Sequence, residues 1–279
     1  MDEMTVKDIQ YITSNINSLW MASKDCSLEP LPQKKALLEQ LSNIFSIFPP
    51  LDPNGDSRNP LNIILPAYET LWRVVLRCFL EVHFRATSNQ AEMQDSLNSL
   101  MSCPTQETFE DVSAEGISAK VIVREALRLY PPTRRIHRLI SPINPVPHGP
   151  WYQLLNLLDM APTNDPEVIH AIDVEHLHRT PEIWGEDSLT FNPSRTHDAK
   201  QVGFMPFGAR PFVCPAGNSF APMMIGICVG ALIKAFPDDA EGEGWKLMDV
   251  EGKRVDLAKI DGPLDNGREG FSGLVLTRC

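Results

Sequence analysis

Residues 204–236 read FMPFGARPFVCPAGNSFAPMMIGICVGALIKAF, a loop rich in proline and glycine that leads into a long apolar run. Proline and glycine prevent a regular helix around Cys214. From Phe220 onward the apolar run predicts a buried helix. A thiol just before a helix N-terminus lies in a positive backbone field, which favours the thiolate. Cys214 is therefore a candidate metal ligand or nucleophile, with an inert buried thiol as the plain alternative.

The composition is that of a globular, acidic chain. Hydrophobic residues make up 43% of the sequence, enough for a sizeable core, and the formal net charge is −11, which argues against nucleic-acid binding. The six cysteines include no CxxC pair and no zinc-finger spacing, which indicates a reducing, intracellular setting. The N-terminus is polar and acidic, and the apolar run at 222–236 is short and contains Lys234. We therefore expect neither a signal peptide nor a membrane span in this chain.

Hydrophobic periodicity predicts a mainly helical chain. Two packing helices are expected at about 5–21 and 32–47, followed by a proline- and glycine-rich break over 49–60. A long central helix is expected from about 61 to 85, with apolar side chains on nearly every face. Small β elements near the C-terminus complete an α+β arrangement.

The C-terminal part carries the strand signals. Asp-Asn-Gly at 265–267, followed by the strand-like GLVL, predicts a hairpin. The proline-rich stretch 140–165 contains an apolar island, WYQLLNLLDM, that the pattern does not assign to an element. We divide the chain into a helical N-terminal segment, residues 1–54, and a core, residues 55–279.

The central helix carries charged residues every four positions, a spacing that favours ion pairs along one stripe. These residues are Glu69, Arg73, Arg77, Glu81 and Arg85. Pro66 lies inside the helix and predicts a kink beside Glu69 and Thr70. The plain alternative is that Glu69 pairs with Arg73 and that the Thr70 hydroxyl bonds to the carbonyl of Pro66.

A second helical pattern, ISAKVIVREALRLY, ends at two prolines and places Glu125 and Arg128 three residues apart on one face. By itself such a pair is most often a weak surface ion pair. The basic residues that follow, among them His137 and Arg138, would suit an anionic group, although a solvated loop is the default interpretation. His170, His176 and His178 lack a metal-binding spacing, so we expect no metal site there.

Four segments, taken together and in this order, resemble the C-terminal half of the cytochrome P-450 family, the haem-thiolate monooxygenases. PAYETLWR at 66–73 resembles the oxygen-groove motif of the family's long central helix, and EALR at 125–128 matches its ExxR pattern. PEIWG at 181–185 with FNPSR at 191–195 resembles the aromatic loop, and FGARPFVCPAG at 207–217 resembles the cysteine-ligand loop. The resemblance implies a helical haem-binding core over residues 55–279.

The resemblance also implies roles for particular residues. Cys214 would be the axial thiolate ligand of haem b, with Phe207 in the same loop contacting the cofactor. Arg138 is the first choice and His137 the second for a haem-propionate partner. Glu69 and Thr70 would be catalytic and would deliver protons. The structural clamp behind the cysteine loop would consist of Glu125, Arg128 and Arg195.

The cysteine loop departs from the family pattern at several positions. Arg210 stands four residues before Cys214, where the family usually has glycine, and Phe212 stands two before it, where the family has a basic residue. Ala216 occupies the usual place of a glycine, and Gly217 comes one residue later. We expect these differences to alter the β-bulge around Cys214 and to remove one propionate contact.

The function that the resemblance implies is insertion of one oxygen atom into a small apolar substrate, in secondary metabolism, with electrons from NADPH through a reductase partner. Two other functions stay open. One is a non-catalytic, truncated haem-thiolate remnant or interaction module, because residues 1–60 show no counterpart of the family's substrate-pocket roof. The other is a haem-thiolate isomerase or dehydratase, against which Thr70 argues.

A truncated chain would expose apolar faces, so we expect self-association and weak catalysis when the chain is made alone. The expected location is intracellular, cytoplasmic for this chain. A full-length anchored form would lie on the cytosolic face of the endoplasmic reticulum.

Overall fold

A computed structural model describes most of the chain. The residues it describes are 5–22, 32–44, 61–85, 89–140, 168–195, 203–210, 212–238, 244–267 and 269–279. The expected break over 49–60 and the apolar island at 151–160 lie outside these residues. The chain divides into two compact units, Met1–Arg73 and Val74–Cys279.

The first unit is helical, as the sequence predicts. Helix α1 spans Val6–Ala22 and α2 spans Pro32–Ile44, while α3, Leu61–His83, begins in this unit. Thr5 starts α1 by accepting a 3.2 Å hydrogen bond from the Asp8 N–H, and Asp8 accepts one of 2.9 Å from the Thr5 N–H. This exchange satisfies two of the N–H groups at the helix start that have no partner within the helix.

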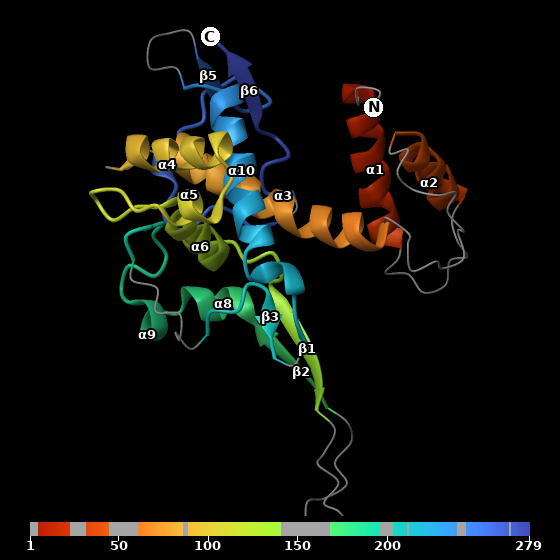
Figure 1. Ribbon diagram of the computed structural model, residues 1–279, viewed down its shortest axis with the longest axis horizontal. Coiled ribbons are helices and arrows are strands. Elements are labelled where there is room, and N and C mark those ends of the chain that lie inside the picture. Colours follow the sequence, from red (N-terminus) through yellow and green to blue (C-terminus); the bar gives the residue numbers. More distant parts are fainter. Residues whose placement is uncertain are drawn as a thin grey trace, which may run out of the picture. The chain divides into compact units, whose positions relative to one another are not determined.

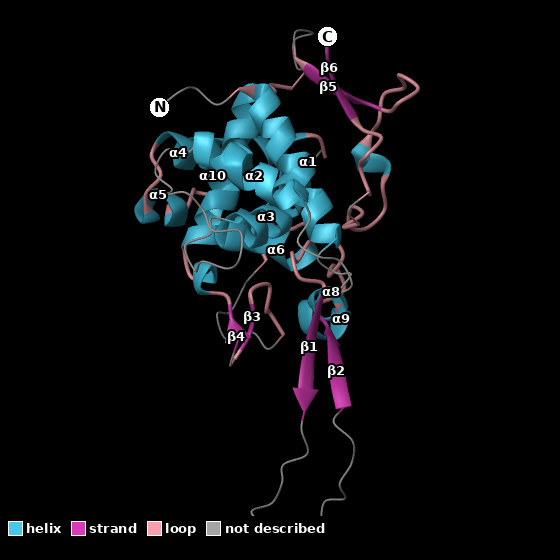
Figure 2. Cartoon of the chain, turned by 90° about the vertical axis from the view of Figure 1, so that its right-hand side faces the viewer, coloured by secondary structure: helices cyan, strands magenta, loops and turns pink. Residues whose placement is uncertain are grey.

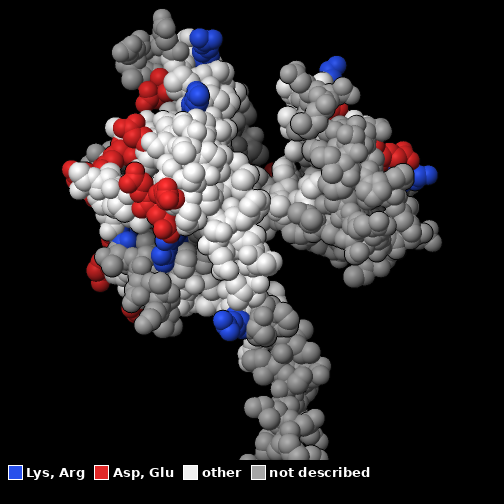
Figure 3. Space-filling model, in the orientation of Figure 1, with Lys and Arg blue, Asp and Glu red and all other residues white. Residues whose placement is uncertain are grey.

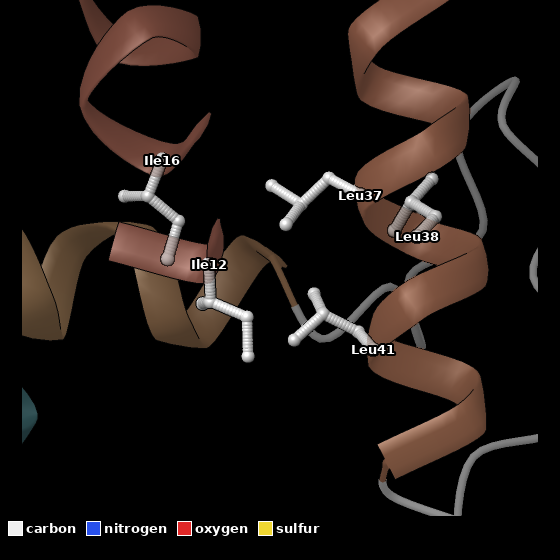
Figure 4. Close-up of a cluster of buried hydrophobic side chains, with 5 residues drawn as sticks. All are labelled: Ile12, Ile16, Leu37, Leu38 and Leu41. Carbon is white, nitrogen blue, oxygen red and sulfur yellow. The ribbon is translucent and has the colours of Figure 1, made fainter. Parts of the chain in front are cut away.

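The core of the first unit forms between α1 and α2. Figure 4 shows Ile12 and Ile16 of α1 facing the side of α2 that carries Leu37 and Leu41. The buried cluster consists of Ile12, Ile16, Leu37, Leu38 and Leu41, with Ile64 and Tyr68 of α3 packed against it. The spacing of three and four residues puts each apolar pair on one helix face, which is why these two helices pack.

Helices dominate the second unit too. They are the end of α3, α4 (Gln90–Ser102), α5 (Gln106–Glu110), α6 (Ala119–Leu129), α8 (Val174–Arg179), α9 (Pro181–Trp184) and α10 (Phe220–Ala235). Helix α10 packs against α4 and α6 (Figure 1). Among the described residues, no helix combines the length and the hydrophobicity needed to cross a bilayer.

Helix α10 is buried or half-buried over most of its length, as its apolar sequence predicts, and it is most fully buried along one stripe. Phe220, at its start, is 64% exposed. The stripe is rich in small residues, and Gly226 and Gly230 let α10 approach α4 closely. A Cβ at Gly230 would lie 2.5 Å from the carbonyl oxygen of Leu97, and one at Gly226 would lie 2.7 Å from Leu100 Cδ2. The buried residues are Ala221, Pro222, Ile225, Gly226, Val229, Gly230 and Ile233.

Within the described part of the chain, the strands form three short antiparallel pairs, drawn in magenta in Figure 2. They are β1 (Arg135–Ile140) with β2 (Val168–Asp173), β3 (Gly208–Ala209) with β4 (Phe212–Val213), and β5 (Trp245–Met248) with β6 (Val275–Arg278). These small pairs beside many helices confirm the predicted mainly α fold. Acidic side chains stand out on the face of this unit that Figure 3 shows, over α4 and α5.

The prediction of a hairpin centred on residues 265–267 is wrong. Strand β6 pairs with β5, far back in the sequence, and the Asp-Asn-Gly turn packs on α3 instead. Arg77 of α3 donates from Nε to the Asp265 carbonyl at 3.0 Å and from Nη2 to the Gly267 carbonyl at 2.6 Å. The turn therefore binds a buried guanidinium and does not join two paired strands.

Other charged groups of the stripe on α3 also hold the C-terminal loops. Arg85 donates to Glu81 at 2.8 Å, as the spacing predicts, and to the carbonyls of Ile260 and Gly262 at 2.6 and 2.8 Å. The Tyr130 hydroxyl donates to the buried Glu81 carboxylate and accepts from Leu264 N–H at 3.0 Å. Burial raises the pKa of Glu81.

The close approach of α10 to α4 gives a stability prediction. Gly230→Ala pushes a methyl group against a backbone carbonyl, so we expect the free energy of unfolding to fall by about 1–3 kcal/mol, although alanine adds roughly 1 kcal/mol of helix propensity. Urea denaturation measures the change. Gly226→Ala is the matched control, because its new Cβ meets the end of a leucine side chain that can rotate. A Gly230→Ala protein as stable as the parent would contradict the packing described.

Candidate functional site

The site begins with a buried ion pair on α6. The Ser118 hydroxyl caps the start of α6, accepting from Val121 N–H at 3.4 Å, and the prolines after Tyr130 end it. Glu125 and Arg128 then lie on one face, and both side chains are fully buried. Arg128 Nε donates to Glu125 Oε2 at 2.8 Å, and Nη2 donates to Oε1 at 2.7 Å. This two-point geometry is the strongest form of the Arg–carboxylate pair.

The remaining donors of Arg128 bind backbone carbonyls from the segment after α6. Nη1 donates to the carbonyls of His178 at 2.8 Å and Ser188 at 2.6 Å, and Nη2 donates to that of Thr190 at 3.2 Å. All five N–H groups of the guanidinium therefore have acceptors, and its carbon lies 5.2 Å from the centre of the Trp184 ring. One side chain thus fixes the backbone at three places that are 50 to 62 residues away along the chain.

Glu125 is held from the other side by the aromatic loop. Its Oε1 accepts from the Asn192 N–H at 3.0 Å and lies 3.4 Å from Arg195 Nε. Arg195 also donates to the Trp184 carbonyl at 2.5 Å and to the Asp187 carboxylate at 2.8 Å, and these hydrogen bonds hold the pKa of Asp187 below its usual value. The structure therefore brings together Glu125, Arg128 and Arg195, the three residues of the predicted clamp.

His178 connects this clamp to the segment that leads to the cysteine. Its ring Nδ1 lies 3.1 Å from the carbonyl oxygen of Arg128, and its Nε2 accepts from Met205 N–H at 2.9 Å. The ring stacks on Phe204 with centroids 5.4 Å apart. Sequence reasoning considered His178 only as a metal ligand and missed this role. A histidine shortly before the aromatic loop was the available signal, but its partners are set by the tertiary fold.

Cys214 lies at the end of a tight hairpin. Gly208 has a φ of +86°, which residues with a side chain rarely adopt. In the β3–β4 pair, Gly208 lies opposite Val213. The Cys214 N–H donates to the Phe207 carbonyl at 2.9 Å. The hairpin therefore forms with Arg210 in its turn, where the family pattern has glycine.

The segment after Cys214 differs from the expected direct entry into a helix. A short 3₁₀ turn, Pro215–Gly217, follows the cysteine, and α10 begins only at Phe220. Gly217 packs under the ring of Phe207, because a Cβ there would lie 2.6 Å from Phe207 Cγ. Gly217 therefore has a packing role that the family pattern did not assign to it, and the Phe207 side chain against it is half-buried.

The Cys214 side chain is a free, exposed thiol. Val213 and Phe220, on either side of it in sequence, are 46% and 64% exposed. Haem brings four nitrogen ligands of its own and requires one axial ligand from the protein. The exposed thiol of Cys214, with its exposed apolar neighbours, fits that requirement.

The other predicted site residues lie on separate elements. His137 and Arg138 are neighbours in β1, opposite Ala171 and His170 of β2, and His137 is exposed. Glu69 and Thr70 lie on α3 within the first unit, and Glu69 is buried. The Thr70 hydroxyl donates to the carbonyl of Ala67 at 3.3 Å, one residue beyond the Pro66 carbonyl that the plain alternative names.

Comparisons with known proteins identify relatives of this part of the chain. The sequence model of the family described as Cytochrome P450 matches residues 167–251, which contain both the aromatic loop and Cys214. The chain is 32% identical over 126 residues to "Cytochrome P450 CYP72A616" of Paris polyphylla, and 31% identical over 122 residues to "Cytokinin hydroxylase" of Arabidopsis thaliana. It is 30% identical over 125 residues to "Secologanin synthase 2" of Catharanthus roseus.

These alignments cover part of each protein. They span 42–43% of this chain and 21% of each of the three relatives. The chain therefore matches about a fifth of the length of these curated relatives.

The clamp generates a second stability prediction. Glu125→Ala leaves a buried guanidinium without its carboxylate, so we expect the free energy of unfolding to fall by about 3–5 kcal/mol. Asp187→Ala is the matched control, because Asp187 contacts Arg195 from a side chain that is 51% exposed, and exposed pairs contribute about 1 kcal/mol or less. Equal denaturation midpoints for the two variants would show that the buried pair does not hold the unit together.

Proposed function

We propose that this chain, which is similar to cytochrome P450 proteins and matches their family model over residues 167–251, binds haem through the Cys214 thiolate and oxidises a small apolar substrate. The observation that supports this most is the exposed thiol of Cys214 on a hairpin that lies within the region matched by the family. Electrons would come from NADPH through a reductase partner inside the cell. One atom of dioxygen would enter the substrate, in keeping with a role in secondary metabolism.

Each residue of the site has a definite task in this proposal. Haem, if held by the Cys214 thiolate, would supply the activation of dioxygen. Cys214 is the ligand, and Phe207, whose ring packs against Gly217, would contact the cofactor from the same loop. Arg138 and, second, His137 of β1 would pair with the propionates, since a guanidinium binds carboxylates at two points.

The clamp does not touch the substrate in this proposal. Glu125, Arg128 and Arg195 fix the backbone of the aromatic loop. Their charged groups form hydrogen bonds with one another and with backbone carbonyls. Their task is to hold the segment that precedes the hairpin. Glu69 and Thr70 are proposed to deliver protons, because a hydroxyl beside a carboxylate on a helix can pass a proton inward from solvent.

Haem ligation is tested by the spectrum of the reduced carbon monoxide complex of the haem-loaded chain. A trans thiolate shifts the Soret band strongly to the red, so the parent chain should show the shifted band and Cys214→Ser should lose it. Cys103→Ser is the matched control, since Cys103 is also a free, exposed thiol. A shifted band that survives in Cys214→Ser would rule out Cys214 as the ligand.

Proton delivery is tested by comparing electrons consumed with product formed. Thr70→Ala should keep its haem but divert electrons to peroxide, so that product per NADPH falls by about 10-fold or more. Thr13→Ala is the control, because the Thr13 hydroxyl makes a similar 2.9 Å bond to the preceding turn of α1, at the Ile9 carbonyl. Equal coupling in both variants would leave Thr70 with a structural role alone.

A further inference from the structure

One histidine ring joins the clamp helix to the chain that carries Cys214. His178 lies at the end of α8, 50 residues after Arg128 and 27 residues before Met205. Its Nδ1 lies 3.1 Å from the Arg128 carbonyl oxygen, and its Nε2 lies 2.9 Å from the Met205 backbone nitrogen. The ring is fully buried.

The two partners define the chemical state of the ring. A carbonyl oxygen can only accept, so Nδ1 carries the hydrogen, and an N–H can only donate, so Nε2 carries the lone pair. Burial lowers the pKa of His178 to about 4, which keeps the ring neutral at pH 7. A neutral ring with its hydrogen on Nδ1 satisfies both bonds at once, whereas a protonated ring would lose the bond to Met205.

Aromatic side chains hold the ring in its plane. Phe204 stacks on it with an interplanar angle of 22°, and Trp184 meets it edge-on with centroids 6.2 Å apart. Trp184 also lies under the Arg128 guanidinium, and the Arg124 guanidinium lies 5.3 Å from the Phe204 ring centre. The Nε2 atom is therefore presented to the chain at a fixed position.

From Met205 a short series of backbone bonds reaches the cysteine. The Met205 carbonyl accepts from Gly208 N–H at 3.1 Å, and the Phe207 carbonyl accepts from Cys214 N–H at 2.9 Å. Between these two bonds lies the β3–β4 pairing of Gly208 with Val213. The position of Met205 consequently sets the base of the hairpin on which the thiol stands.

We propose that His178 is a positioning residue for Cys214: by accepting from Met205 N–H while anchored to the Arg128 carbonyl, it places the cysteine hairpin relative to the clamp. The inference rests on the proposed function, since the position of the thiol matters for ligation only if Cys214 binds haem. It assigns the Nε2–Met205 bond, and not the ring's bulk, as the feature that counts.

Three substitutions separate the two bonds of the ring. In His178→Gln the amide oxygen reaches the place of Nε2 and can accept from Met205 N–H. In His178→Asn the shorter amide reaches only the place of Nδ1 and can donate to the Arg128 carbonyl. His178→Phe keeps the ring's bulk and loses both bonds.

The first readout is the fraction of reduced, carbon monoxide-bound haem that shows the red-shifted thiolate band. We express this as the ratio of shifted to unshifted species. The ratio should fall about 5-fold or more in the Asn and Phe variants, because loss of one hydrogen bond gives a change of that size. In the Gln variant the ratio should stay nearer the parent value. Equal ratios in the parent and all three variants, or a larger loss in Gln than in Asn, would overturn the inference.

The second readout does not need haem. Hydrogen exchange of the Met205 and Cys214 amides in the haem-free chain should be faster by about 5-fold or more in the Asn and Phe variants than in the parent. The Gln variant should exchange at a rate between that of the parent and those of the other two variants. Cys214→Ser should leave both amides as slow as in the parent, since it changes no bond of the series. Unchanged exchange at Met205 in the Phe variant would also overturn the inference.

A measurement on the unmodified chain decides the case even if the Phe variant does not fold. In protein labelled with ¹⁵N, the Met205 nitrogen and His178 Nε2 should show a scalar coupling across their hydrogen bond, and a coupling-free Met205 amide would contradict the bond itself. The failure of the proposed function looks different. If the parent lacks the thiolate band while the Met205 amide responds to His178, haem ligation by Cys214 is wrong and His178 positions the hairpin for another purpose.

Discussion

The buried pair between Glu125 and Arg128 is the interaction on which the second unit depends. Removing two charges from water costs several kcal/mol for each ion, and a single pairing rarely repays that cost. Here all five guanidinium N–H groups find acceptors, and Glu125 also receives the Asn192 N–H. The pair therefore fixes the position of the backbone around it, because a shift of any of these carbonyls would leave a buried charge without its hydrogen bond.

The pair fixes the segment from α8 to Arg195, which has little regular secondary structure of its own. Helices α8 and α9 are one to two turns long, and residues 185–195 form an irregular loop of turns and bends. Arg128 holds the carbonyls of His178, Ser188 and Thr190, and His178 in turn holds Met205 at the start of the cysteine hairpin. His178 therefore links α6 to the base of the cysteine hairpin, and the aromatic loop and Cys214 both lie within the stretch that the family model matches.

Local patterns in the sequence predicted most of the helices, and the resemblance to the cytochrome P-450 family predicted the mutual contact of Glu125, Arg128 and Arg195. They failed where distant groups decide the outcome. The Asp-Asn-Gly turn at 265–267 has hairpin chemistry, yet Arg77 binds its carbonyls and β6 pairs with β5. The apolar run of α10 hid which face packs, although two glycines four residues apart were a signal for close helix contact. Backbone acceptors such as the Ser188 carbonyl carry no mark in a sequence, so the full set of partners of Arg128 could not be predicted.

The central claim, that the clamp helix and the aromatic loop form one cooperative unit, is tested most directly by native-state hydrogen exchange in increasing denaturant. The Asn192 amide, bonded to Glu125, is compared with the amide of Leu129 at the end of α6. The account predicts that both exchange with the same free energy and the same denaturant dependence, because the loop cannot open without exposing the buried pair. Exchange of Asn192 through a local opening, independent of denaturant and faster than that of Leu129, would contradict it.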